Sequence, residues 1–209
     1  MRRRDSTASR ARRLRPLVAV SQQSHCLNAL LHRWHDGHLP IDIVGIVSNH
    51  DDQRSITEWY GIPFVHLPIE QGRKPEQEAQ LLDVFERQGA DLLVLARYMQ
   101  ILPPEICEQY VGQVINIHHS FLPSFVGAKP YHQAAERGVK LIGATCHYVT
   151  QELDAGPIID QDVIRISHND TVEDMVRLGK DVEKSVLARG VRSHLEDRVL
   201  LHGNKTIVF

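Results

Sequence analysis

The stretch LVAVSQQSHCLNALLHRWHDGHLPIDIVGIVSNH, residues 17–50, largely determines the fold that we expect. Residues 17–20 are apolar throughout, as in a strand buried on both faces. From Ser24 to Gly37 the apolar residues follow helical spacing, with one face made of Leu27, Leu30, Leu31 and Trp34. Residues 41–50 are a second apolar run. A strand, a helix and another buried strand predict a parallel sheet with a covering helix.

The same alternation continues along the rest of the chain. Further strands are predicted at 63–67, 91–97, 114–118, 140–150 and 157–166, and helices at 55–60, 75–89, 103–111, 131–138 and 170–195. The last helix is expected to start at Asn169–Asp170. The ending RVLLHGNKTIVF holds two strand-like runs about a Gly-Asn turn. We therefore expect an α/β fold: a Rossmann-like, mostly parallel sheet with helices on both faces and a C-terminal β-hairpin.

Composition limits the class of protein. The chain has 209 residues, and no apolar run is long enough for a transmembrane helix, so no membrane association is expected. Cys26, Cys107 and Cys146 are far apart and form no CxxC pair. They therefore suggest neither a disulfide framework nor a zinc ribbon, and a reducing cytoplasm is the expected location.

The first 15 residues differ from the rest in charge. They hold seven arginines and one acid, which makes a strongly basic arm. A basic arm can bind nucleic acid, but this one has no aromatic residue for base stacking. We expect residues 1–15 to be a disordered arm, residues 16–209 to be the catalytic domain, and no nucleic acid to be a partner.

The segment INIHHSFLPSF, residues 115–125, carries the most suggestive polar residues. On a strand, Asn116 and His118 share one face, whereas His119 points to the other and is expected to be structural. The two histidines therefore cannot bind one metal as strand neighbours, and no metal site is predicted. An amide and an imidazole on one face instead make an oxyanion-type site.

A second polar segment is HYVTQELDAGPII, residues 147–159. Ligands bind outside the carboxyl ends of parallel strands, where this segment, INIHHSFLPSF and ARYMQILPP are all expected to lie. Asp154 before Ala-Gly-Pro has two readings: ordinary turn chemistry, or a carboxylate that fixes the imidazole of His118 and holds a water.

These segments together resemble the folate-dependent formyltransferase family. The shared pattern is Asn-x-His on a strand, a loop like SFLP, and a later Asp-x-Gly, and the resemblance covers about residues 17–209. It implies a 10-formyltetrahydrofolate substrate and a catalytic set of Asn116, His118 and Asp154. The implied pterin site consists of Met99, Gln100, Ile101, Leu102, Val149, Thr150, Glu152 and Leu153. His147 is either a partner of the site or a structural histidine, and Lys129 is either a solvated loop residue or a contact for the substrate's glutamate tail.

Within the family, SHCLNALLHRW, PSFVGAKPYHQA and HGNKTIVF resemble segments of the hydrolytic branch. The related purine-pathway transferases hold the acceptor's phosphate in a glycine-rich turn after the first strand. Here that turn reads SQQSHCLN, and Gln22, Gln23 and His25 are expected to fill the space. Water would then be the acceptor, with formate and tetrahydrofolate as products. The formate would supply purine synthesis, and the reaction would balance the one-carbon pool.

The resemblance sets the remaining expectations. No permanently bound cofactor and no metal is expected, and the protein is expected to be a homo-oligomer. Hydrolytic members usually carry an ACT domain before the catalytic domain, where this chain has the arginine-rich arm. The alternative function is formyl transfer to a phosphorylated amine such as glycinamide ribonucleotide.

Overall fold

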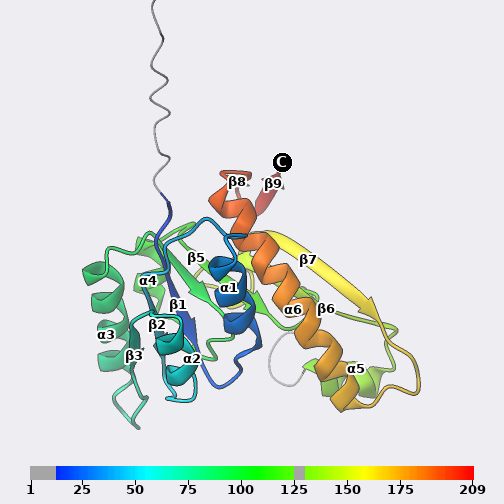
Figure 1. Cartoon of the computed structure of the whole chain (residues 1–209). Helices are drawn as coiled ribbons and strands as arrows, with labels where there is room; N and C mark the ends of the chain where they lie inside the picture. Colours follow the sequence, from blue (N-terminus) through cyan, green and yellow to red (C-terminus); the bar gives the residue numbers. More distant parts are fainter. Residues whose placement is uncertain (1–12, 125–129) are drawn as a thin grey trace, which may run out of the picture.

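The computed structural model describes residues 13–124 and 130–209. Within these ranges the chain forms a seven-stranded sheet in the order β3-β2-β1-β4-β5-β6-β7 and a separate two-stranded hairpin, β8-β9 (Figure 1). Most of the predicted arm lies outside the described residues, and so does Lys129.

The predicted elements are confirmed, with boundaries shifted by a few residues. The strands of the sheet are β1 Pro16–Val20, β2 Gly45–Ser48, β3 Phe64–His66, β4 Leu92–Leu95, β5 Val114–His118, β6 Leu141–Tyr148 and β7 Ile158–Arg165. The helices are α1 His25–His35, α2 Arg54–Trp59, α3 Lys74–Arg87, α4 Pro104–Gln109, α5 Pro130–Arg137 and α6 Val172–Leu195. The hairpin consists of β8 Val199–His202 and β9 Lys205–Val208.

Strand β1 shows how the sheet is covered on both faces. Val18 and Val20 pack into one core with α1 and α6, while Leu17 and Ala19 pack into a second core with α3 and α4. Strands β1 to β5 are parallel. Every residue of β1 is buried, which agrees with its uninterrupted apolar sequence.

Strands β6 and β7 depart from the parallel pattern. β6 runs antiparallel to β5, and β7 runs antiparallel to β6. The expectation that the segment after β6 leaves at the carboxyl edge of the parallel strands is therefore wrong. It leaves at the opposite edge, where the Val149 amide donates to the Val114 carbonyl at the start of β5 (2.9 Å). To reach the end of β5, this loop must turn back over the face of the sheet.

Helix α6 is the longest element and packs against α1, β5, β6 and β7. Its N-cap is Thr171 rather than Asn169 or Asp170, because Thr171 and Asp174 form a reciprocal capping box. No helix in the described part of the chain is both long and apolar enough to cross a membrane.

Candidate active site

The two faces of β5 have different roles. Ile115 and Ile117 pack in the core with α1 and α6. Asn116 and His118 line a cavity of about 370 Å³ instead, as strand alternation predicts. The Asp154 loop closes one side of this cavity, and the segment after β4 forms another.

His118 and Asp154 come together as a buried pair. The Nδ1 atom of His118 lies 3.2 Å from Oδ1 of Asp154, and their side chains are 6% and 9% exposed. Burial alone would raise the pKa of Asp154, but the interaction with His118 holds it below its ordinary value. Nε2 of His118 is buried and has no hydrogen-bond partner among the described residues.

Asp154 also has the backbone of a turn residue. Its φ is 56°, in the left-handed region that aspartate tolerates better than most residues. The two readings of Asp154 are therefore compatible: the same residue turns the loop and places its carboxylate on His118.

Asn116 is held by His147, which lies directly opposite it on β6. Nδ2 of Asn116 lies 3.2 Å from Nε2 of His147, and Nδ1 of His147 lies 2.9 Å from the carbonyl of Tyr148. A carbonyl only accepts, so Nδ1 carries the proton and Nε2 accepts from the Asn116 amide. Burial lowers the pKa of His147, which favours this neutral form.

All eight residues expected to bind the pterin line the same cavity: Met99, Gln100, Ile101, Leu102, Val149, Thr150, Glu152 and Leu153. Met99, Ile101 and Leu153 are more than half exposed, although large apolar side chains usually avoid water. Such an apolar lining beside a few buried polar groups is typical of a small-molecule site.

Two cavity residues were missed or misjudged from sequence. His119 also lines the cavity, although it was expected to point away. β5 ends at His118, so strand alternation no longer governs the next residue. Burial, with the nearby Arg97, lowers the pKa of His119 to about 3. Arg97 follows β4 and also lines the cavity. The sequence indicates it only by a charged residue at the end of an apolar strand.

Comparison with known proteins shows the family of this chain. A family model described as "Formyl transferase" matches residues 14–191. The formyltetrahydrofolate deformylase of Corynebacterium sp. (strain P-1) is 54% identical over 95% of this chain and 70% of its own length. The chain belongs to the formyl transferase family, in its deformylase branch.

Solved structures place the chain in the same branch. A formyltetrahydrofolate deformylase from Pseudomonas syringae pv. tomato superimposes with a TM-score of 0.94 at 62% identity, covering 95% of this chain and 67% of that one. Glycinamide ribonucleotide transformylase 1 from Symbiobacterium toebii is more distant, with a TM-score of 0.89 at 28% identity over 94% of both chains. The present chain spans about two thirds of the length of the deformylases that it matches.

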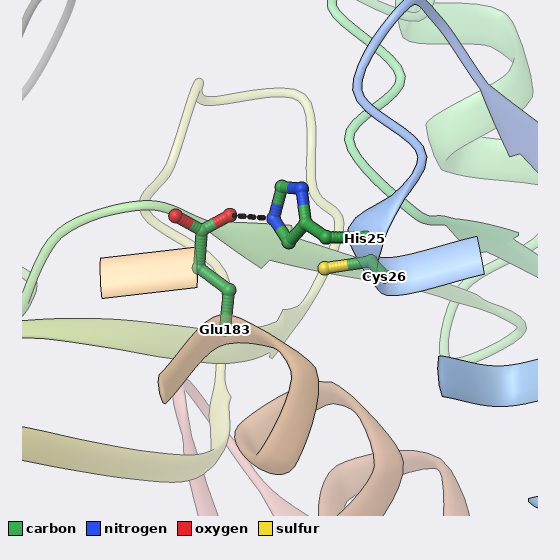
Figure 2. Close-up of side chains that lie close together, drawn as sticks. All are labelled: His25, Cys26 and Glu183. Carbon is green, nitrogen blue, oxygen red and sulfur yellow. Dashed lines mark hydrogen bonds and ion pairs between the residues drawn. The ribbon is translucent and has the colours of Figure 1, made fainter. Parts of the chain in front are cut away.

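In this member of the deformylase branch, the turn after β1 leads into a buried cluster. His25 turns inward and its Nε2 lies 2.8 Å from Oε2 of Glu183 on α6, with Cys26 beside them (Figure 2). Gln22 is exposed, whereas Gln23 and His25 are partly buried. That these three side chains fill the space of an acceptor's phosphate stays a prediction.

The ligand atoms of His25, Cys26 and Glu183 all lie within 4.8 Å of one another, a spacing that a metal ion could use. The surroundings favour a structural cluster. Glu183 already accepts from Tyr131 and faces Arg97, which places a cation beside the carboxylate. Burial raises the pKa of the Cys26 thiol well above its ordinary value, which disfavours the thiolate that a metal needs.

Proposed function

We propose that this chain hydrolyses 10-formyltetrahydrofolate to formate and tetrahydrofolate. The observation that carries the proposal is the buried His118–Asp154 pair beside the Asn116 amide, at the wall of an apolar cavity. Two formyltetrahydrofolate deformylases are similar to this chain over 95% of its length. The formate would supply purine synthesis, and the reaction would balance the one-carbon pool.

The side chains fit each step of the hydrolysis. Water oxygen bonds to the formyl carbon, and the carbonyl oxygen becomes negative. The Asn116 amide and the protonated His118 ring stabilise that oxygen, while Asp154 orients the ring and accepts the water's proton. The bond from carbon to N10 then breaks as Asp154 passes that proton to N10, and the formic acid product ionises to formate. These steps use protein side chains alone.

Transfer to an amine is the alternative function, and the turn after β1 argues against it. In the related transferases this turn is rich in glycine. Here it has no glycine, and its His25 is bonded into the interior through Glu183. Without glycine, the backbone N–H groups of this turn cannot close as tightly around a phosphate at the helix start, which disfavours a phosphorylated acceptor.

The deciding experiment measures formate released from 10-formyltetrahydrofolate with no acceptor present. Formate should appear at a rate that added glycinamide ribonucleotide does not change. The Asp154→Asn variant should still bind folate but release formate at least about 100-fold more slowly, because it loses the carboxylate that handles the proton. Turnover that requires the acceptor, or full activity of Asp154→Asn, would overturn the proposal.

Two further parts of the proposal concern the setting of the enzyme. All three cysteines are free and buried, which supports a reducing cytoplasm as the location.

The apolar surface of the β8–β9 hairpin supports a homo-oligomer. Leu200 and Ile207, paired across the hairpin, are 54% and 46% exposed. A second copy of the hairpin would cover these residues and extend the two open strand edges.

A further inference from the structure

Arg97 lies where the order of strands in the sheet changes direction. From β1 the chain adds β2 and β3 on one side, and β4 and β5 on the other. Ligands of open α/β sheets bind in the crevice at this switch point. Arg97 is at the centre of it, because its carbonyl accepts from the Ser21 amide (3.2 Å) in the turn after β1.

The backbone of Arg97 is in a conformation that arginine rarely adopts. Its φ is 65°, in the left-handed region, where a residue with a Cβ is disfavoured by about 1 kcal/mol or more. Glycine would adopt this conformation without that cost. The chain nevertheless has a long cationic side chain here, and that side chain is only 12% exposed. A large cation at a position suited to glycine suggests that the guanidinium has a task.

One hydrogen-bond donor of the Arg97 side chain, Nε–H, has no acceptor among the described residues. Its Nε lies 3.4 Å from Oε2 of Glu183, but this atom is buried and has no hydrogen-bond partner in residues 13–124 and 130–209. The two oxygens of Glu183 are already engaged, at 2.8 Å each, by Tyr131 and His25. Glu183 therefore balances the charge of Arg97 without accepting from its Nε–H. A buried donor left without an acceptor is unfavourable, and a ligand that accepts from it would remove that penalty.

A second unsatisfied donor lines the same cavity. Nδ1 of His118 faces Asp154, and Nε2 of His118 is buried without a partner in the described residues. When the ring carries both protons, Nε2 and the guanidinium of Arg97 offer donors to one ligand. An anion suits this pair, because both groups are then cationic. The hydrolysis also creates an anion beside the negative Asp154, and a nearby cation offsets that repulsion.

We infer that Arg97 and Nε2 of His118 form a subsite for a small carboxylate, and that its ligand is formate. The inference rests on the proposed hydrolysis, in which formate is the product. Arg97 would hold the anion after the bond to N10 breaks, while His118 keeps its contact with the former formyl oxygen, which is then one of the two oxygens of formate.

The test uses sodium formate and the full chain without folate, so that binding is measured apart from catalysis. Isothermal titration at constant ionic strength compares the wild type with Arg97→Gln. The matched control is Arg192→Gln, which removes an exposed arginine from α6 whose Nε lies 2.9 Å from Glu196. Arg97→Gln should weaken formate binding by at least about tenfold, the loss expected for a charge-assisted hydrogen bond, while the control stays within about twofold.

Further measurements keep the inference falsifiable. Arg97→Lys keeps the charge but not the planar fork, and should bind formate with intermediate affinity; it replaces Arg97→Gln if thermal melting shows that variant to be unfolded. Formate should also inhibit hydrolysis competitively, and less so in the variant. Equal binding by the wild type and Arg97→Gln would overturn the subsite, as would preferential displacement of formate by L-glutamate. Absence of acceptor-free formate release would instead refute the proposed hydrolysis.

Discussion

Asn116, which we propose stabilises the developing oxyanion, has a partner that fixes the direction of its side chain. An amide side chain can rotate, and its oxygen and nitrogen occupy similar volumes, so packing alone does not decide which one faces the substrate. In this site the Nε2 of His147 accepts one N–H of Asn116, and the Tyr148 carbonyl fixes the tautomer of His147. The remaining N–H of Asn116 is thereby available to the formyl oxygen.

Replacing His147 should therefore slow catalysis without removing a group that touches the substrate. In His147→Phe we expect kcat for formate release to fall by about tenfold, the cost of one lost hydrogen bond, with little change in KM. The control is His194→Phe, which loses a hydrogen bond to the Tyr148 hydroxyl at a partly buried site outside the cavity. If the two variants have the same kcat, His147 does not position Asn116.

Residue-scale predictions from sequence succeeded where the backbone was regular. Strand alternation placed Asn116 and His118 correctly because β5 is regular through His118. It failed for His119 because the strand had ended. Arg97 was missed because no local pattern shows that its own backbone is left-handed, and this conformation decides which way its side chain turns.

At the scale of elements, α6 contains Gly179, a residue that lowers helix stability but makes room for a side chain of α5. Glycine in a helix costs about 1 kcal/mol relative to alanine. A Cβ at Gly179 would overlap the hydroxyl of Tyr131 on α5, the group that donates to the buried Glu183. The glycine thus allows α5 and α6 to share a buried hydrogen bond.

The effect of Gly179→Ala on the free energy of unfolding should consequently have opposite signs in the wild type and in a Tyr131→Ala variant. In the wild type it should lower the free energy of unfolding by about 1–3 kcal/mol, because displacing Tyr131 leaves the buried carboxylate with one donor fewer. In a Tyr131→Ala background the same change should raise that free energy, because only helix propensity remains. Urea unfolding of the four proteins measures both values. A destabilisation of equal size in both backgrounds would contradict this account.

The elements themselves were predictable, but the direction of β6 was not. Apolar runs and turn residues gave the order of strands and helices, because burial dictates composition locally. Composition does not record whether a strand runs parallel or antiparallel to its neighbour. That depends on the path of the connection through α5, which only the folded chain shows. The approach of Asp154 from the opposite edge could not be predicted for the same reason.

At the scale of the whole molecule, buried histidines should make the protein sensitive to acid. The folded state holds the pKa of His119 at about 3, and an unfolded histidine titrates near 6.5. Between these values the unfolded chain binds a proton that the folded chain does not, so stability falls as pH falls through this range. Asp154 and Glu183, with lowered pKa values, add a further loss below about pH 4.

His119→Gln should therefore flatten the pH dependence of stability between about pH 6.5 and 4. The slope should decrease by at most about 1.4 kcal/mol per pH unit, the effect of one proton. Urea midpoints at several pH values measure it. His132→Gln, at an exposed position on α5, is the control and should keep the wild-type slope. Parallel curves for all three proteins would show that His119 is not protected from protonation in the folded state.

Assembly is the other property of the whole molecule. A Leu200→Lys, Ile207→Lys double variant should reduce the molar mass measured by light scattering to that of one chain, because charged residues would face each other across the shared surface. Trp59→Lys, at a residue of α2 that is 71% exposed, should leave the mass unchanged. A wild type that is monomeric at all concentrations would refute the homo-oligomer.

The pairing of β5 with β6 has a consequence for how faithfully the chain must fold. Asn116 is paired with His147, and His118 with Thr145, so two functional side chains depend on one alignment. Sliding β6 by a single residue would turn His147 toward the core and bring Cys146, now fully buried there, to the cavity. That arrangement is unfavourable because it would bury the polar His147 side chain in the apolar core. Hydrophobic burial thus selects the register: a chain that has buried its core correctly has also aligned the side chains of the proposed active site.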